Sequence, residues 1–368
     1  MRLLMIGRMR YRLPLSAGLQ AKFDALGRRL DLRVLGSGVE GSPRRDPTFE
    51  LAGPYRPRFL DGALYFLGLP LRTRRELRRN PPDAVLVQGA HEAWFVLLGR
   101  ALARSRAPVI LDVHGDWASS TRLYGSPARR LLNPVADRIA VSALRRSDAV
   151  RTISDYTTRR VRSYGVEPAL VFPAFMDLEP FLEPAVPPPA APRALFVGVL
   201  EHYKGIEELA AAWRTVAATL PGATLHVVGR GSRREVVERL VAELPGRTEW
   251  TEALPAEGVA RALDASTLLV LPSRSEGMGR VLVEAFCRGR PAVASRVGGI
   301  VDLVQDGQNG LLVPPQDPAA LADALLRVLS DPDLAARLGA GAAASAGAWV
   351  STAEEYAARV ESLVAGLR

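Results

Sequence analysis

Short apolar runs alternate with amphipathic segments along the whole chain. In the first half, the runs predict strands at 2–7, 32–36, 84–89, 108–115, 149–154 and 169–174. In the second half, they predict strands at 194–199, 224–229, near 249, 267–272, 291–295 and 310–314, with helices at 205–220, 232–244, 278–288, 318–330 and 351–366. Continuous apolar runs are typical of parallel strands that are buried on both faces. The pattern therefore predicts two α/β domains built from βα units.

A Pro/Ala-rich stretch separates the two halves. Residues 183–193 read EPAVPPPAAPR, a composition that favours an extended and fairly stiff chain. We predict an N-terminal domain at 1–182, a linker at 183–192, a C-terminal domain at 193–348 and a helix at 349–368 that crosses back to the N-terminal domain. Doubly wound domains bind ligands beyond the carboxyl ends of their strands, so we expect the site in the cleft between the two domains.

Composition narrows the class of protein. The 368 residues are 48% hydrophobic and 24% charged, which is typical of a soluble globular protein. A single cysteine, Cys287, excludes a disulfide framework and a Cys-rich metal site, and it fits a cytoplasmic setting. The N-terminus lacks the features of a signal peptide. No apolar run reaches the roughly 18 residues that a membrane helix needs.

The charge balance allows three kinds of partner. The net charge of +9 and the pI of about 10.2 fit nucleic acid, an anionic membrane surface or an anionic small substrate. Basic residues are spread along the chain and no nucleic-acid-binding motif is present, so we expect no nucleic acid partner. Only two of the 48 basic residues are lysines, Lys22 and Lys204, which makes both positions notable.

The segment SRSEGMGRVLVEAF at 273–286 joins a predicted strand to a predicted helix. The unpaired N–H groups and the dipole of a helix start attract an anion, and Gly277 and Gly279 let the backbone approach it. Glu276 and Glu284 lie at most about 12 Å apart if the segment is helical. That separation suits a ligand whose diphosphate lies between two groups with paired hydroxyls, which carboxylates bind well. The apolar neighbours of Glu284 predict that it is buried and paired rather than solvated.

Two further segments carry charge or glycine at a helix start. In FVGVLEHYKGIEELAAAW, at 196–213, Gly198 ends a strand and Lys204 precedes a helix. A lysine there suits a phosphate, although a plain surface lysine is the alternative. Gly298 and Gly299 start another predicted helix, as a second anion cradle or as a tight turn.

Together these segments resemble the donor-binding half of retaining glycosyltransferases of family four. The Glu-x7-Glu signature, the Gly-Gly pair, the run DGQNGLLVPPQDPAAL and the start at 197–205 match in order over 193–345. The segments DVHGD (112–116), SDAVRTISDYT (147–157) and VFPAFMD (171–177) resemble the family's N-terminal half more weakly. The resemblance implies an α/β fold of GT-B architecture, with two doubly wound Rossmann-like parallel-sheet domains that face each other across a cleft.

The resemblance also implies an activity. The expected reaction moves a hexosyl group from a nucleoside diphosphate sugar to a hydroxyl acceptor with retention of configuration, in glycolipid, cell-envelope polysaccharide or glycoconjugate biosynthesis. Glu276, His114 and Lys204 are the implied catalytic residues, at the sugar hydroxyls, the anomeric carbon and the diphosphate. For His114, a core histidine is the alternative. The implied donor-binding residues are Glu284 at the ribose, and Gly277, Met278, Gly279, Arg280, Gly198 and Gly18 around the phosphates.

The sequence departs from the family pattern at two places. Val199 stands where the family usually has an arginine, so the diphosphate lacks one cation unless Arg280, Arg274 or another arginine supplies it. The N-terminal loop reads SAG, ending at Gly18, instead of carrying a double glycine. No DxD-like cluster is obvious, so we expect no metal and no cofactor besides the substrate, although DVHGD offers possible ligands.

The acceptor is expected on the N-terminal domain. The segment FLDGALYFLGLPLRTRRELRR at 59–79 joins an apolar stretch to Arg72, Arg74, Arg75, Arg78 and Arg79. We interpret it as a surface that docks on the inner face of an anionic membrane to reach a lipid-linked acceptor. An ordinary amphipathic helix with a solvated basic face is the alternative.

Two other functions fit the same residues. Another GT-B enzyme, such as a nucleotide-sugar epimerase, would use the same fold for a different reaction. A non-catalytic nucleotide-sugar binder is suggested by Val199. Donor hydrolysis or transfer separates the binder from the transferase.

Overall fold

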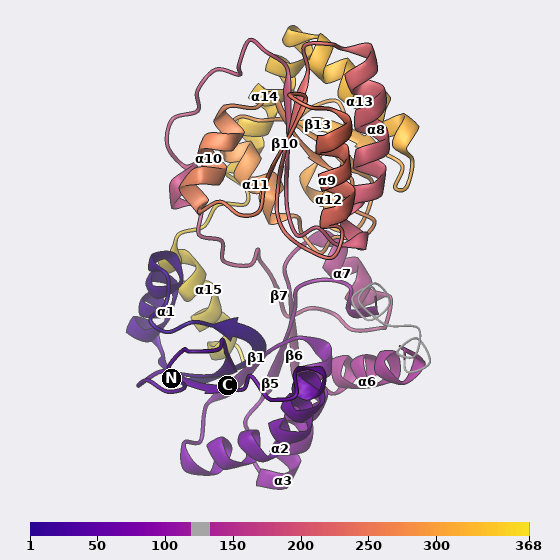
Figure 1. The fold of residues 1–368 in the computed structure, drawn as a ribbon. Coiled ribbons are helices and arrows are strands. Elements are labelled where there is room, and N and C mark those ends of the chain that lie inside the picture. The colour runs from indigo at the N-terminus through magenta and orange to yellow at the C-terminus, as the bar shows by residue number, and fades with distance from the viewer. Residues whose placement is uncertain (119–132, 368) are drawn as a thin grey trace. The chain divides into compact units, whose positions relative to one another are not determined.

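The computed structural model describes residues 1–118 and 133–367 and divides them into two compact units (Figure 1). Unit 1 comprises Met1–Phe175 and Ser351–Arg368, and unit 2 comprises Met176–Val350. The chain therefore leaves unit 1, builds all of unit 2 and returns to unit 1 at its end.

Unit 1 is built on a parallel sheet. Among the described residues, its strands follow the order β3-β2-β1-β4-β5-β6-β7, and every pairing is parallel. The strands are β1 Arg2–Tyr11, β2 Asp31–Gly38, β3 Phe49–Ala52, β4 Ala84–Gln88, β5 Val109–Val113, β6 Ala149–Thr152 and β7 Leu170–Val171. The helices are α1 Ala17–Arg29, α2 Asp61–Arg79, α3 Ala90–Ala103, α6 Asn133–Arg146, α7 Asp155–Arg162 and α15 Ala353–Ala365, with a 3₁₀ turn η1 at Arg58–Leu60.

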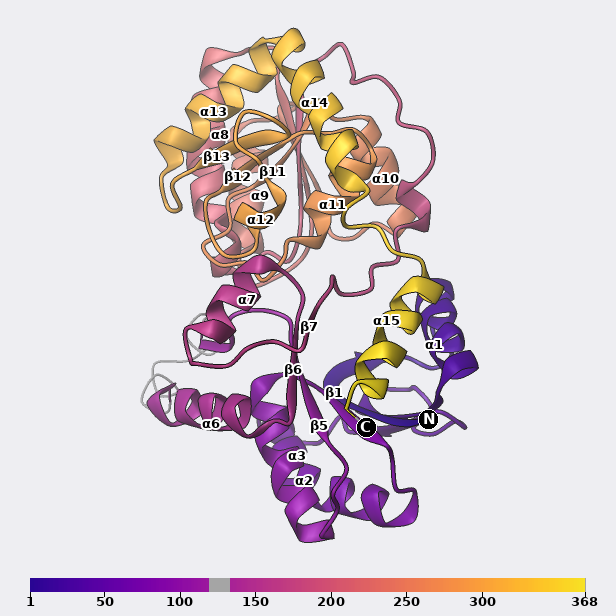
Figure 2. The same ribbon diagram turned by 180° about the vertical axis from the view of Figure 1, so that it is seen from behind.

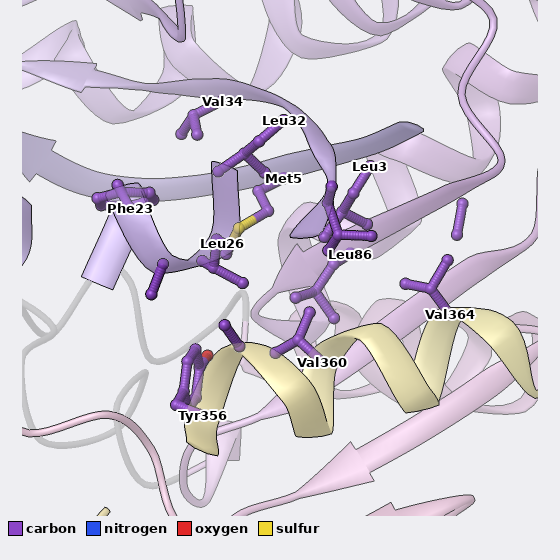
Figure 3. Packing of buried hydrophobic residues seen from close by; sticks show 14 of the residues in the cluster. Leu3, Met5, Phe23, Leu26, Leu32, Val34, Leu86, Tyr356, Val360 and Val364 are labelled. Atoms are coloured by element: carbon purple, nitrogen blue, oxygen red, sulfur yellow. The ribbon is translucent and has the colours of Figure 1, made fainter. Parts of the chain in front are cut away.

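Alternation along β1 explains why helices cover both faces of this sheet. Leu3 and Met5 belong to a core cluster shared with α1 and α15, whereas Leu4 and Ile6 belong to a second cluster shared with α2, α3 and α6. Figure 3 shows the first cluster, in which Tyr356 and Val360 of α15 lie under the sheet. Successive strand side chains point to opposite faces, so an all-apolar strand needs cover on both.

The C-terminal helix lies beside the first helix of the chain. Both views of the ribbon show α15 and α1 side by side (Figures 1 and 2), and Arg29 of α1 pairs with Glu361 of α15 at 2.8 Å. Thr352 caps the start of α15 by accepting a hydrogen bond from the Glu355 N–H. Residues 351–367 thus complete the core of unit 1.

Unit 2 repeats the architecture. Among the described residues, its sheet has the order β10-β9-β8-β11-β12-β13, again with parallel pairings. The strands are β8 Arg193–Val197, β9 Thr224–Val228, β10 Thr248–Thr251, β11 Leu268–Leu271, β12 Ala292–Ser295 and β13 Gly310–Val313. The helices are α8 Ile206–Thr219, α9 Arg234–Glu243, α10 Ala256–Asp264, α11 Arg280–Cys287, α12 Ile300–Leu303, α13 Pro318–Ser330 and α14 Pro332–Ala346, with 3₁₀ turns η2 at Glu179–Phe181 and η3 at His202–Lys204.

The predicted α/β class with two parallel sheets is confirmed, with local differences. The short edge strand β3 was not predicted, because four residues give too little pattern. The strand predicted at 169–174 contracts to Leu170–Val171. The sequence predicts a linker at 183–192, whereas this segment belongs to unit 2 and the passage between units follows Phe175. Buried Arg288 and Arg290 donate to the backbone carbonyls of Glu183 and Val186, which holds the segment on unit 2.

Candidate active site

The turn between β11 and α11 carries the first predicted site residues. Gly279 caps α11 with a left-handed backbone, φ +78°, that favours glycine. Gly298 (φ +53°) and Gly299 pack directly against this turn, because a Cβ atom on them would lie 1.9 Å and 2.1 Å from the carbonyl oxygens of Glu276 and Gly277. The Gly299 N–H donates to the Glu276 carbonyl at 3.0 Å. The glycine pair therefore supports the Glu276 turn. Of the two readings given for this pair, the contacts favour a tight turn, and the helix that follows it, α12, has only four residues.

A second loop places Lys204 against the same turn. Gly205 has φ +70°, and a Cβ atom there would lie 2.0 Å from the Pro272 carbonyl oxygen, so the two backbones touch. The Lys204 ammonium lies 2.5 Å from Glu276 Oε2, and the side chains are only 11% and 15% exposed. Ser273 Oγ donates to the same carboxylate oxygen at 3.3 Å. Residues 72 positions apart in sequence thus form one ion pair at the mouth of the turn.

Gly198 lies next to this lysine. It follows β8, and a Cβ atom on it would lie 3.8 Å from Lys204 Cε. The carbonyl oxygen of Gly198 in turn lies so close to Gly229, after β9, that a Cβ atom there would be 1.8 Å away. The two glycines therefore let the ends of the neighbouring strands β8 and β9 approach closely beside Lys204.

Inside α11, Glu284 is buried, as predicted, and its partner within the structure is Arg280. Glu284 is 8% exposed, and its Oε1 accepts from Arg280 Nε at 2.6 Å. Arg280 also donates through Nη2 to the Asp177 carbonyl at 3.0 Å. Burial raises the pKa of Glu284, although the Arg280 guanidinium opposes that rise. Met278, in the turn before the helix, is buried as well.

The cations named as substitutes at Val199 are already engaged. Val199 itself is 45% exposed. Arg274 pairs with Glu208 at 2.6 Å and contacts His202, and Arg280 holds Glu284. Sequence reasoning missed Arg230, which directly follows Gly229 after β9. Its carbonyl accepts from the Leu200 N–H at 3.0 Å, and its exposed side chain has no ion pair within the described part of the chain. The signal was a lone arginine between two glycines after a strand.

In unit 1, His114 directly follows β5 and its side chain is 38% exposed, so it is not a core histidine. Its Nε2 lies 2.7 Å from Asp112 Oδ2. Asp112 is fully buried and also accepts from Arg151 at 2.6 Å. Burial by itself raises the pKa of Asp112, but Arg151 and then His114 hold it well below its usual range. Gly18 is buried at the second position of α1.

Helix α2 presents an exposed stripe. Leu64, Leu67 and Leu71 of α2 are exposed at helical spacing, continuing from exposed Leu60 just before the helix, and Phe59 is 76% exposed. Arg78, in the last turn, is also exposed. Two of the five predicted basic residues are engaged within the unit, because Arg72 donates to the Glu50 carbonyl and Arg75 pairs with the Glu50 carboxylate.

Residues 1–118 and 133–367 contain no group of three or more His, Cys, Asp or Glu side chains arranged to hold a metal ion. Within the same residues, every helix is too short or too polar to cross a membrane.

Comparisons with known proteins agree with this architecture. The family model described as "Glycosyltransferase Family 4" matches residues 23–179, and the one described as "Glycosyl transferases group 1" matches residues 191–331. The chain is 31% identical over 274 residues to the 2-deoxystreptamine glucosyltransferase of Streptomyces kanamyceticus, which covers 69% of this chain and 70% of that protein.

Two solved structures share the fold over nearly their whole length. Sucrose-phosphate synthase from Thermosynechococcus elongatus superposes with a TM-score of 0.79 at 23% identity, covering 100% of this chain and 99% of that one. The Anabaena protein HepE, in complex with UDP-glucose, superposes with a TM-score of 0.69 at 17% identity, covering 100% and 98%.

The two parallel-sheet domains and the matched families define a glycosyltransferase of GT-B architecture. Within that class, the chain belongs to glycosyltransferase family 4, as both half-chain models and the Streptomyces relative show. The predicted fold class and family resemblance are therefore confirmed.

Proposed function

We propose that the chain is a retaining hexosyltransferase that uses a nucleoside diphosphate sugar. The observation that carries the proposal is the pair of ion pairs at the start of α11, Lys204 with Glu276 and Arg280 with Glu284. Each pair joins a cation suited to phosphate with a carboxylate suited to hydroxyls. The UDP-glucose complex of HepE, which shares the fold, supports a donor of this class.

Donor binding exchanges partners within these pairs. The diphosphate takes the Lys204 ammonium and the free N–H groups at Gly279 and the α11 start. Glu276 is then free to accept hydrogen bonds from the sugar hydroxyls, while Glu284 accepts them from the ribose hydroxyls. Both carboxylates therefore have partners in each state. A cation pairs with each one when no donor is bound, and hydroxyl groups of the donor donate hydrogen bonds to them when it is bound.

The chemistry needs stabilisation of the leaving group more than a nucleophile. The bond from the anomeric carbon to the phosphate oxygen breaks, and a bond to the acceptor oxygen forms on the same face. The acceptor proton passes to the departing phosphate. Lys204 and the helix N-terminus oppose the negative charge that grows on the diphosphate, which is the electrostatic form of catalysis. In unit 1, His114 is the proposed third catalytic residue, and the loop before Gly18 is proposed to contact phosphate.

We assign the missing cation at Val199 to Arg230. The carboxyl ends of β8 and β9 are adjacent, and Gly198 touches Gly229 there. A long side chain from position 230 has the reach to serve a phosphate that binds at Lys204. Arg280 is already assigned to the start of α11 and Arg274 pairs with Glu208, so the exposed Arg230 is the better candidate for the additional cation.

The proposed reaction uses no metal. Lys204, Arg230 and the helix N-terminus together offer enough positive charge for a diphosphate. Transfer in the presence of excess EDTA is therefore expected to equal transfer without it. A loss of activity with EDTA that Mg²⁺ or Mn²⁺ restores would reject this part of the proposal.

The acceptor is proposed to be a hydroxyl compound that binds unit 1, lipid-linked and reached from the inner face of the membrane. The stripe of leucines on α2, followed by arginines, fits a helix that lies in an anionic interface. A soluble aminocyclitol acceptor, of the kind named for the Streptomyces relative, is the competing possibility.

Vesicle binding tests the membrane part. The chain should sediment with vesicles of phosphatidylglycerol and phosphatidylcholine at low salt, and less with phosphatidylcholine alone. Leu67→Ser with Leu71→Ser should abolish sedimentation, whereas Leu182→Ser, another exposed apolar residue, should leave it intact. Equal binding of all variants would remove the membrane assignment.

Product analysis tests the reaction itself. The chain is incubated with nucleoside diphosphate hexoses, first without and then with hydroxyl acceptors, and the anomer formed is identified by NMR. An α-linked product from an α-linked donor is the expected result. An inverted product would reject retention. Nucleotide binding without hydrolysis or transfer would favour the non-catalytic binder, and an epimerised sugar would favour the epimerase.

A further inference from the structure

A buried ion pair stands directly behind His114. Asp112 on β5 and Arg151 on β6 are register partners in neighbouring strands, and both side chains are fully buried. Asp112 Oδ1 accepts from Arg151 Nη1 at 2.6 Å, and Oδ2 lies 2.7 Å from His114 Nε2. Both carboxylate oxygens are thus engaged, one by the arginine and one by the histidine.

Arg151 is itself fixed in place. Its Nη2 donates to the carbonyls of Phe172 at 2.8 Å and Pro173 at 2.7 Å, and its guanidinium lies 3.8 Å from the centroid of the Phe172 ring. The ring of Tyr356, from the C-terminal helix, lies 5.7 Å away on the same cation. A carboxylate held by so constrained a partner has little freedom to follow a moving imidazole.

The pairing decides which nitrogen of His114 carries the proton. An ionised carboxylate can only accept hydrogen bonds, so Nε2 must donate to Asp112. In the neutral ring, Nδ1 is then the unprotonated acceptor and the nitrogen left for a ligand. The tautomer is fixed by a partner behind the ring, in the way that carboxylates orient catalytic histidines elsewhere.

We propose that Asp112 is the positioning residue for His114, which it holds in the Nε2–H tautomer with Nδ1 presented to the substrate. The catalytic part of this inference rests on the proposed role of His114. In this role Asp112 contacts no reacting atom and acts only by holding the imidazole of His114.

The first test uses the unaltered chain. Nitrogen-15 NMR distinguishes the two neutral tautomers, and the chain has only four histidines. The signals of His114 are those missing from His114→Gln. We expect protonation at Nε2 in the wild type and a mixture of tautomers in Asp112→Asn. A wild-type ring that is protonated at Nδ1 overturns the proposal, and this result does not depend on any substrate or on the stability of a variant.

The second test separates positioning from support of the fold. Asp112→Asn should lower turnover by about 100-fold, the scale of a misplaced catalytic group. In a His114→Gln background, the same change should cost less than about twofold, because Asp112 then has nothing to position. Asp148→Asn is the matched control, since Asp148 pairs with Arg100 and accepts from Val109 at the opposite end of β5.

Each outcome bears on one claim. A further large loss from Asp112→Asn in the His114→Gln background assigns Asp112 to fold support and overturns the proposal. Full activity of His114→Gln removes His114 from catalysis, and the positioning role with it. If no donor is turned over at all, the proposed function fails, while the tautomer measurement still supports or rejects the hold of Asp112 on His114.

Discussion

The two units contain the same kind of contact, a carboxylate beside a cation, in opposite surroundings. In unit 2, Lys204 and Glu276 are 11% and 15% exposed, and Arg280 is 53% exposed beside Glu284. In unit 1, Asp112 and Arg151 are both fully buried. A pair that reaches solvent can be opened by a ligand that compensates both partners, whereas a sealed pair costs too much to open. The first arrangement suits exchange, and the second suits fixing a neighbour.

Breaking the sealed pair should have the largest effect. Arg151→Met leaves the Asp112 carboxylate buried without its cation, so we expect the free energy of unfolding of unit 1 to fall by about 4 kcal/mol. Arg214→Met, which removes the half-exposed partner of Glu243 in unit 2, should change the stability of that unit by less than about 1 kcal/mol. Urea denaturation of both variants measures this difference. Similar losses in both would contradict the distinction between the pairs.

A second buried cation in unit 1, Lys22, should make the stability of this unit depend on pH. Lys22 is 5% exposed against the ring of Tyr356, and burial lowers its pKa to about 8. Between this value and the unfolded value of about 10.4, the unfolded chain binds more protons, so stability should rise with pH by up to about 3 kcal/mol. Lys22→Met should remove that rise in thermal unfolding measured from pH 7.5 to 10.5. An unchanged pH dependence would show that the ammonium is not desolvated.

In the Lys204–Glu276 pair, we expect loss of the carboxylate to lower turnover without weakening nucleotide binding, which depends on the cation. Glu276→Gln should lower turnover about 100-fold, because the sugar loses its acceptor of hydrogen bonds in the transition state. Nucleoside diphosphate binding should become tighter, since Lys204 no longer has to leave a carboxylate. Steady-state kinetics and calorimetry measure the two effects. Glu257→Gln on the exposed start of α10 is the control, and near-wild-type turnover of Glu276→Gln would refute the assignment.

The smallest effect is expected for Arg230, the proposed substitute for the cation missing at Val199. Arg230→Ala should weaken donor binding by about tenfold, as expected for one charge-assisted contact to phosphate. Val199→Arg in the same chain should restore it, because the charge returns to the neighbouring strand end. Arg234→Ala, which removes a cation paired with Glu238, should leave donor affinity unchanged. Unchanged donor affinity in Arg230→Ala would leave the diphosphate served by Lys204 and the helix alone.

Local sequence pattern determined most of the fold. The apolar runs located the strands of both sheets except the edge strand β3, because parallel strands that are buried on two faces are apolar in most positions. The helix predicted at 318–330 is α13, whose start the Asp317 carboxylate caps by accepting a hydrogen bond from the Ala320 N–H at 2.9 Å. The strand, glycine turn and helix around Glu276 were predictable for the same reason. These features depend on neighbours in sequence, so the sequence alone contains them.

Only the tertiary structure decided which charges meet. It paired Lys204 with Glu276 and Asp112 with Arg151, engaged Arg274 with Glu208, and left Arg230 exposed. It also packed the glycine pair at 298–299, for which the sequence left two readings open, against the Glu276 turn. Contacts between residues far apart in sequence depend on how strands and helices stack. A local sequence pattern cannot predict these contacts, because each carboxylate could pair with any of many arginines in the chain.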